Sequence, residues 1–266
     1  MKLTVLSYLA PSVPAELFAA LADHVEAALS CEVELCFDAS RSGPRPGEHD
    51  PLRAGEVDLA FVCATSYVWM TGGTDASCRL AGAAWVPTDP RSAGRAIYFG
   101  DVLVPTAVNV RGLADLAGRR VAYNDDVSLS GYYSLRLALG TAGVDAGAVD
   151  LVCSGSHLQS LELLRHGKVD AAAIDSNVWR RRRREDPLLA RDLQAVAALG
   201  PHPVQPVVVR AGLAVSLVAE VRAALLDATT TDRVREAMAD AEFSGFTRVD
   251  EGDYAELRTQ LAAAGF

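Results

Sequence analysis

The feature that most constrains this chain is an eleven-residue segment that occurs twice. Residues 52–62 (LRAGEVDLAFV) align with residues 164–174 (LRHGKVDAAAI), and six of the eleven positions are identical. Each copy has the pattern of a helix that ends at a glycine, a tight turn with an aspartate, and a buried apolar strand. Such a step is half of an α/β crossover. Because the copies lie far apart in the chain, the repeat predicts two α/β lobes with one copy each.

The rest of the chain suggests how the two lobes are connected. A length of 266 residues suits two lobes, each with its own core. Two extended apolar stretches without a helical period, residues 96–104 and 195–209, flank the middle third and predict two crossings between lobes. We therefore expect a discontinuous lobe of residues 1–97 and 205–266, and an inserted lobe of residues 98–204. A two-segment hinge would join them and leave a ligand cleft.

Local patterns fill in the first lobe. Residues 3–6 predict a strand, and the apolar spacing after Pro14 predicts a helix. Residues 33–37 alternate as a strand does, and residues 40–51 are rich in Gly, Pro and charge, as loops are. The tail from residue 217 to 266 is predicted as amphipathic helix that packs on the core. Its predicted core contacts are Val221, Leu225, Val234 and Met238, followed by a stripe of Tyr254, Leu257 and Leu261.

Charge and composition exclude several classes of function. The formal net charge of −9 does not favour binding to nucleic acid or to an anionic membrane. The arginine run Arg180–Arg184 is predicted to be a solvated helix surface. No apolar run reaches about 18 residues, so no direct membrane insertion is expected. The five cysteines are scattered without metal-ligand spacing, which predicts buried reduced thiols.

The amino terminus bears on localisation. It lacks the apolar region and cleavage site of a secretory signal, which predicts a cytoplasmic chain as the sequence is written. The prediction becomes extracytoplasmic if the start site is misassigned or if the chain is processed.

Candidate ligand-binding residues gather in the predicted second lobe. Ser128 and Ser130, followed by Gly131, stand where a helix begins after a strand. The free N–H groups and the dipole at such a helix start favour an anion. A serine there also caps the helix in many proteins, and both interpretations stay open. His157 falls at a second helix start and is a candidate donor to an oxyanion.

Three further candidates lie at strand ends or in a crossing. Asp175 stands at the carboxyl end of the second repeat strand, the edge of an α/β sheet where ligands bind. Tyr67 follows the equivalent strand of the first lobe, next to Ser66. Tyr98 lies in the first crossing. A tyrosine, taken alone, is more often a packed ring than a ligand contact.

With these residues in place, the chain resembles the phosphonate-, phosphite- and phosphate-binding components of ABC importers, which have a type 2 periplasmic-binding-protein fold. The resemblance runs from about residue 53 to residue 209. It rests on the order and spacing of several segments: Ser66-Tyr67-Val68, the stretch around Tyr98, residues 116–122 (LAGRRVA), Ser128-Leu129-Ser130-Gly131, Gly155-Ser156-His157 and residues 169–175 (VDAAAID).

The resemblance implies a role for each candidate. Ser128, Ser130 and the backbone N–H groups around Gly131 would hold the oxyanion, and His157 would donate to it. Asp175 would accept from a protonated oxygen or a ligand amine. Two tyrosines, Tyr67 and Tyr98, would close the cleft, and an ABC permease would be the partner. Leu129 and the segment Cys63-Ala64-Thr65 depart from the family pattern, which leaves the identity of the anion open.

Two other classes of function remain as alternatives. The sequence has no GxSxG, HExxH, P-loop or dinucleotide fingerprint, so we expect no catalytic residue, no metal and no cofactor. Cytoplasmic enzymes with this fold also act on small anionic metabolites, and His157 and Asp175 would then be the acid–base candidates. A cytoplasmic sensor is the third interpretation.

Overall fold

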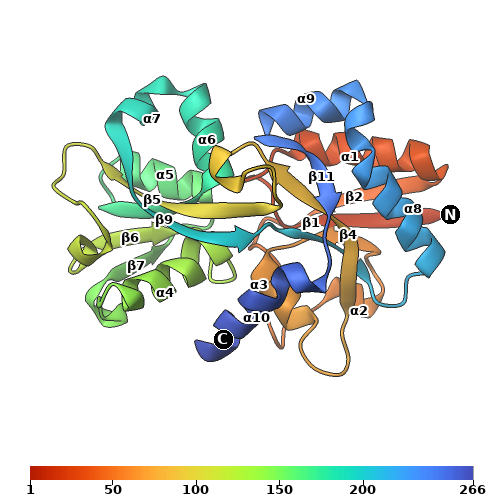
Figure 1. Ribbon diagram of the computed structural model, residues 1–266, viewed down its shortest axis with the longest axis horizontal. Coiled ribbons are helices and arrows are strands. Elements are labelled where there is room, and N and C mark those ends of the chain that lie inside the picture. Colours follow the sequence, from red (N-terminus) through yellow and green to blue (C-terminus); the bar gives the residue numbers. More distant parts are fainter. Residues whose placement is uncertain (266) are drawn as a thin grey trace. The chain divides into compact units, whose positions relative to one another are not determined.

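A computed structural model describes residues 1–265 of the chain, which divides into two compact units (Figure 1). Unit 1 consists of Met1–Ile97 together with the chain from Pro203 onward, and unit 2 is Tyr98–His202. Both are α/β, so the predicted fold class is confirmed.

Unit 1 contains a six-stranded sheet with the order β11-β4-β10-β3-β1-β2. Within it, β1 is parallel to β2 and β3, while β10 and β11 run antiparallel to their neighbours. The strands are β1 (Lys2–Ser7), β2 (Glu32–Phe37), β3 (Leu59–Phe61), β4 (Cys78–Pro87), β10 (Pro206–Arg210) and β11 (Phe243–Arg248). The α-helices are α1 (Ala15–Leu29), α2 (Pro51–Ala54), α3 (Ala64–Met70), α8 (Val215–Leu226), α9 (Asp232–Asp240) and α10 (Ala255–Ala263).

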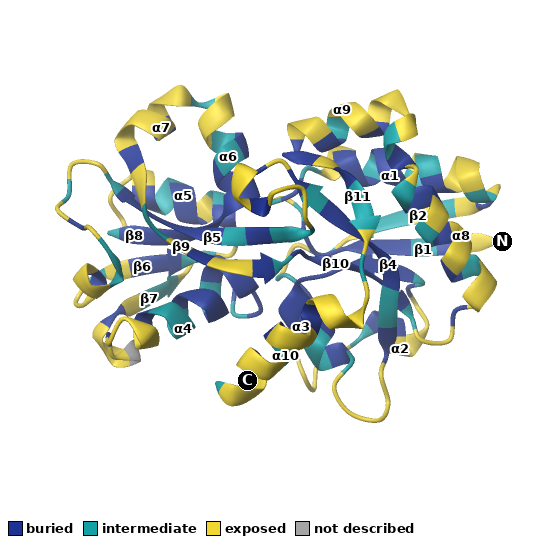
Figure 2. Cartoon of the chain, viewed as in Figure 1, coloured by how far each residue is buried: buried dark blue, intermediate teal, exposed yellow. Residues whose placement is uncertain are grey.

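Aromatic rings form the centre of unit 1. Trp85 on β4 is fully buried and lies 5.3 Å from Phe61, 5.0 Å from Phe243 and 4.5 Å from Phe246 between ring centroids. Phe18, on the buried face of α1, packs edge-on against Phe61 at 5.0 Å. The central strands β1, β3 and β10 are mostly buried, whereas α8, α9 and α10 keep exposed outer faces (Figure 2).

The prediction of a wholly helical tail was wrong in one segment. Phe243–Arg248 is the strand β11, which pairs with β4 in an antiparallel ladder. Its inward-facing rings complete the cluster around Trp85, so sheet packing overrides a weak local pattern. The predicted core contacts of the tail are confirmed: all are at least nine-tenths buried, and they are Val221, Leu225, Val234, Met238, Tyr254, Leu257 and Leu261.

Unit 2 contains a five-stranded sheet with the order β7-β6-β8-β5-β9. The strands β6, β7 and β8 are parallel, and β5 runs antiparallel to β8. The strands are β5 (Ile97–Pro105), β6 (Arg120–Tyr123), β7 (Asp150–Cys153), β8 (Ala171–Asp175) and β9 (Leu193–Pro203). The helices are the π-helix η3 (Leu129–Tyr133), α4 (Ser134–Thr141), α5 (His157–Arg165), α6 (Ser176–Glu185) and α7 (Pro187–Asp192).

Both faces of this sheet are buried, which explains its apolar strands. Val102 and Val121 pack on one side with Leu135 and Leu139 of α4. The opposite side forms a second cluster whose members come from α5, α6, α7 and the strands, among them Leu103, Ala122, Leu161, Leu164, Ile174 and Trp179.

The repeated segment makes the same kind of contacts in both units: it ends a helix and binds a neighbouring strand. Its glycines, Gly55 and Gly167, have positive φ angles of 75° and 65° and end their helices, as predicted. Asp58 then accepts a hydrogen bond from the backbone N–H of Thr4 at 3.1 Å, and Asp170 accepts one from Arg120 N–H at 2.9 Å. Each aspartate thus fixes the start of the neighbouring parallel strand, β1 or β6.

Two smaller predictions need correction. Arg181, inside the arginine run, is only 7% exposed, and it lies one turn after the buried Val178 on the same face of α6. Cys153 is exposed, since it ends the edge strand β7, and Cys36 is half-buried. All five thiols are free.

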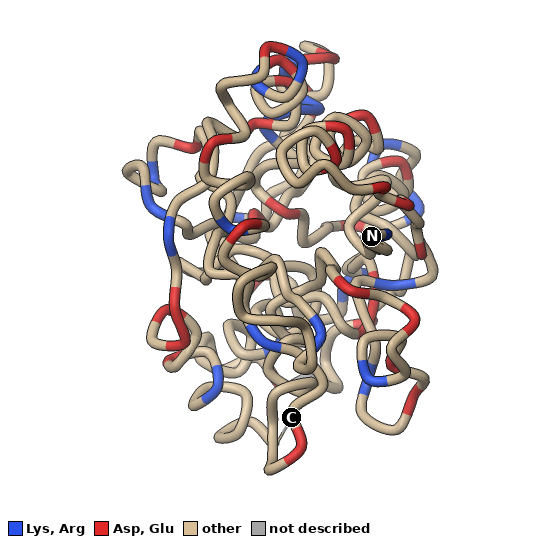
Figure 3. Tube along the Cα trace, turned by 90° about the vertical axis from the view of Figure 1, so that its right-hand side faces the viewer, with Lys and Arg blue, Asp and Glu red and all other residues tan. Residues whose placement is uncertain are grey.

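Within residues 1–265, no helix combines the length and the apolar character needed to cross a membrane. Figure 3 shows acidic and basic residues interspersed over much of the chain trace.

Candidate functional site

The candidate site lies at one edge of the unit 2 sheet. The parallel strands β6, β7 and β8 all point their carboxyl ends to this edge, and a helix starts just after each of them. The helices are η3, which continues into α4, then α5 and α6. Three sets of backbone N–H groups therefore meet at the edge where α/β sheets bind ligands.

The turn between β6 and η3 is held by its own side chains. Asp125 accepts hydrogen bonds from the Val127 backbone N–H at 2.9 Å and from the Asn124 amide at 2.8 Å. Its carbonyl oxygen accepts from Ser128 N–H at 3.3 Å. The serine segment is thus fixed without a ligand.

The two serines differ in their contacts. Ser128 caps η3, since its Oγ accepts from Gly131 N–H at 3.1 Å, but its hydroxyl proton has no acceptor within residues 1–265. Ser130 is 2% exposed, and its hydroxyl has no hydrogen-bond partner in the described part of the chain. The capping interpretation holds for Ser128, while Ser130 is left as an unused donor. Short π-helical turns of this kind occur frequently at functional sites.

Two glycines allow η3 to lie this close to its surroundings. A Cβ atom on Gly131 would stand 1.9 Å from Oδ1 of Asn124. On Gly100 of β5, it would stand 2.6 Å from the carbonyl oxygen of Ser130. Gly100 is also paired with Asp175 across the β5–β8 ladder. Any larger residue at Gly100 or Gly131 would prevent this close packing. The two glycines therefore allow the Ser130 backbone to lie next to the end of β8.

His157 is held against the same strand end. It is the first residue of α5, 4% exposed, and its Nδ1 accepts a long 3.4 Å hydrogen bond from Asp175 N–H. Burial lowers the pKa of His157 to about 4. A hydrogen bond with the Ala173 backbone raises the pKa, but this effect is smaller than that of burial. The imidazole is therefore neutral at pH 7 and brings no positive charge to an anion.

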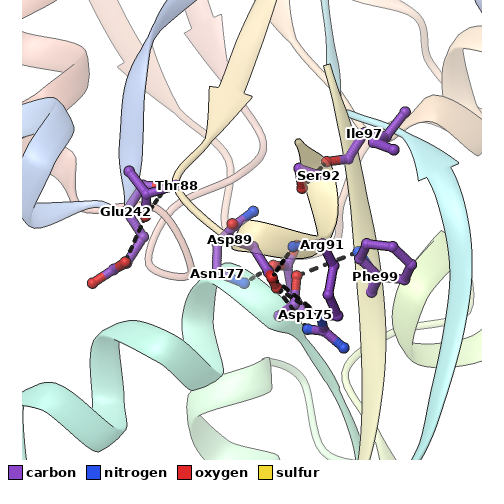
Figure 4. Close-up of polar contacts among 10 residues, drawn as sticks. Thr88, Asp89, Arg91, Ser92, Ile97, Phe99, Asp175, Asn177 and Glu242 are labelled. Carbon is purple, nitrogen blue, oxygen red and sulfur yellow. Dashed lines mark hydrogen bonds and ion pairs between the residues drawn. The ribbon is translucent and has the colours of Figure 1, made fainter. Parts of the chain in front are cut away.

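Asp175 caps the third helix of this edge. Its Oδ1 accepts from Asn177 N–H at 2.8 Å, as Figure 4 shows, and Ser176 Oγ accepts from Phe99 N–H at 3.3 Å. The Asn177 side chain is 5% exposed, and neither its Oδ1 nor its Nδ2 has a hydrogen-bond partner in residues 1–265. An unsatisfied buried amide of this kind is rare and marks a position where a ligand group can complete the hydrogen bonding.

The two predicted tyrosines have different surroundings. Tyr98, at the start of unit 2, is 1% exposed, and its ring centroid lies 6.1 Å from that of His202. Tyr67 lies in unit 1, where it packs edge-on against Tyr254 at 5.1 Å beneath the guanidinium of Arg258. Burial raises the pKa of the Tyr67 hydroxyl, which stays protonated.

The structure therefore brings together Ser128, Ser130, Gly131, His157 and Asp175 through contacts within unit 2. Sequence reasoning missed Gly100 and Asn177, as well as a buried pair formed by Ser134 and His202, whose Oγ and Nε2 atoms lie 2.7 Å apart. The position of Asn177, two residues after the repeat strand, could have indicated it. The other three residues carry no local signal.

Comparison with known proteins agrees with this geometry. Residues 3–254 match the family described as "ABC transporter, phosphonate, periplasmic substrate-binding protein". The chain belongs to this family. The resemblance read from the sequence is thereby confirmed, and proteins of the phosphonate substrate-binding family act in the periplasm.

Solved structures show the same fold. PhnD1 from Prochlorococcus marinus, in complex with methylphosphonate, has a TM-score of 0.82 at 16% identity, over 99% of this chain and 98% of that one. A binding protein of an ABC phosphonate transporter from Pseudomonas aeruginosa has a TM-score of 0.80 at 16% identity, over 97% and 85%. A Xanthomonas citri protein bound to ATP has a TM-score of 0.73 at 19% identity, over 99% and 97%. These likenesses support the two-lobed type 2 periplasmic-binding-protein fold.

Proposed function

We propose that this substrate-binding protein captures a small phosphorus oxyanion, such as a phosphonate, phosphite or phosphate, on the helix starts of unit 2. The observation that carries the proposal is Ser130. Ser130 is 2% exposed, its hydroxyl is unpaired within the described residues, and the close contact between Gly100 and the Ser130 backbone holds it beside the end of β8. A hydroxyl donor with no partner at such a position is free to bind an anion oxygen.

Each residue has a part in the proposed site. Ser128 and Ser130 donate their hydroxyl protons, and the N–H groups at the start of η3 add the positive end of a helix dipole. Asn177 donates through Nδ2, and the neutral His157 donates one N–H. Asp175 accepts from a protonated ligand oxygen or an amine.

The two tyrosines and the cellular context complete the proposal. Tyr67 and Tyr98 contact the substituent of the ligand from their own units. Since the family is periplasmic, we place the activity of this chain outside the cytoplasm, with an ABC permease as its partner.

Isothermal titration calorimetry with methylphosphonate, phosphite, phosphate and sulfate tests the ligand class. One phosphorus oxyanion should bind the wild type and weaken by roughly tenfold or more in Ser130→Ala and Asn177→Ala, since a hydrogen bond to a charged group contributes about 1.5–3 kcal/mol. Ser216→Ala, at an exposed position of α8, is the matched control and should bind as the wild type does.

Two results would contradict the proposal. One is equal affinity in Ser130→Ala, Asn177→Ala and the control. The other is chemical conversion of the bound compound on long incubation, followed by ³¹P NMR, which would favour the enzyme alternative.

A further inference from the structure

Unit 1 contains a hollow of about 400 Å³, and none of the residues that line it belongs to the proposed anion site. It lies at the carboxyl ends of β1 and β2, where Tyr8 and Asp38 follow the two strands, and the loop from Asp38 to Pro51 forms its wall. The ionisable side chains that line it are Asp38, Arg41, Glu48 and His49. Its volume is that of a small-molecule pocket.

The wall of this hollow is fixed by hydrogen bonds. The carbonyl oxygen of Ser42 accepts from Cys63 N–H at 2.8 Å, and the carbonyl oxygen of Pro44 accepts from the buried Ser66 hydroxyl. Ser66, which the family motif places beside Tyr67, is thus committed to this loop. At the far end, Asp50 caps α2 by accepting from Leu52 N–H at 3.0 Å. The hollow is therefore preformed.

Tyr8 presents an unused hydroxyl to the hollow. The residue is 7% exposed and lines the hollow, yet its hydroxyl has no hydrogen-bond partner in residues 1–265. Burial raises the pKa of Tyr8, and the carboxylates of Asp38, Asp50 and Glu56 raise it further. The hydroxyl is therefore protonated, and the electrostatic potential around it is negative.

Asp38 supplies an uncompensated negative charge. Its Oδ1 accepts from Ser40 N–H at 2.8 Å, but no Lys or Arg side chain pairs with it in the described chain. Arg41, the cation nearest in sequence, is already paired with Glu48 at 2.7 Å. His49 in turn contacts Glu56 at 2.8 Å.

We propose that this hollow binds a small organic ammonium group. Its N–H groups would donate to the Asp38 carboxylate and to the Tyr8 oxygen, and its alkyl part would lie against the tyrosine ring. A divalent metal ion fits less well, because Ca²⁺ requires six to eight oxygen ligands and Asp38 is the one unpaired carboxylate among the lining residues. The inference goes beyond the proposed function, because it uses none of the anion donors of unit 2.

Amide NMR of the full ¹⁵N-labelled chain, titrated with ethylammonium chloride, tests the proposal. We expect saturable shifts confined to Tyr8 and the loop from Asp38 to Asp50. Sodium chloride at equal ionic strength and 1-propanol, a neutral molecule of similar size, should not reproduce them.

Two nearly isosteric variants locate the contacts. Asp38→Asn and Tyr8→Phe should each weaken ethylammonium binding by roughly tenfold, whereas Glu16→Gln, an exposed carboxylate on α1, should not. Asp38→Asn should keep the wild-type affinity for methylphosphonate, which separates this site from the anion site. Unchanged ethylammonium binding in both variants, or the same shifts with 1-propanol, would overturn the proposal.

Discussion

At the scale of single residues, Gly131 offers the sharpest test of the anion site. A Cβ atom there would overlap Oδ1 of the buried Asn124 at 1.9 Å. Gly131→Ala should therefore displace the start of η3, abolish methylphosphonate binding in calorimetry, and destabilise the chain by about 1–3 kcal/mol in urea unfolding.

Gly140 provides the matched control for that substitution. It lies in α4, a few residues further along, and a Cβ atom there would meet nothing within 4 Å. Gly140→Ala should keep full binding and stabilise the helix by up to about 1 kcal/mol. Equal binding in both variants would show that the close approach of η3 to Asn124 does not matter to the ligand.

At the scale of elements, η3 is held by two strands of its own sheet. β5 contacts it through Gly100, and β9 reaches Ser134, the residue that follows η3, through His202, whose Nε2 lies 2.7 Å from Ser134 Oγ. The Ser134 hydroxyl also donates to the Leu129 carbonyl oxygen at 2.6 Å. With that proton committed, Ser134 accepts from Nε2–H of His202. The pair is therefore structural and does not activate a nucleophile.

A double-mutant cycle measures this link between β9 and η3. Ser134→Ala leaves the buried His202 N–H unpaired and should destabilise the chain by about 1–3 kcal/mol. His202→Phe alone should also destabilise it, and the two effects should be non-additive by about 0.5–3 kcal/mol in urea unfolding. Strict additivity would mean that the two side chains do not interact in solution.

Local pattern predicted the elements well where it was strong. The repeat correctly indicated β3, β8 and the glycine caps before them, because a helix cap and a buried strand each have a short-range signature. The strand β11 was missed, since Phe243–Arg248 is short, contains a glycine, and owes its conformation to pairing with β4.

The same distinction applies to the candidate site. Ser128, Ser130 and His157 stand at helix starts that the sequence marks. Gly100 and His202 could not be found in this way, because their partners Ser130 and Ser134 are far away in the chain, 68 residues in the second case. Contacts of this range depend on the folded sheet.

At the scale of the whole molecule, two buried histidines set how stability responds to pH. Burial lowers the pKa of both His157 and His202 to about 4, whereas a histidine in an unfolded chain titrates near about 6.5. Between these values, the unfolded chain binds more protons than the native one. The free energy of unfolding should therefore fall as pH drops from about 6.5 to about 4, by up to roughly 3 kcal/mol for each histidine.

Urea unfolding at pH 7, 6 and 5 checks this expectation. His157→Gln and His202→Gln should each reduce the pH dependence in that window. The aspartates with lowered pKa values, such as Asp170, begin from 3.8 and contribute only at lower pH. A wild-type midpoint that does not move between pH 7 and pH 5 would show that the native histidines titrate normally.

The two ends of unit 2 lie next to each other, which bears on whether the unit can be exchanged between related proteins. The strands that carry its ends, β5 and β9, are neighbours in one sheet, and Tyr98 and His202 have ring centroids 6.1 Å apart. In unit 1, the flanking chain is also drawn together, since Val204 N–H donates to the Ala96 carbonyl oxygen at 3.1 Å. Residues 98–202 thus form a segment with adjoining ends, and we expect that it can be exchanged between relatives, together with the proposed anion site, without lengthening any linker.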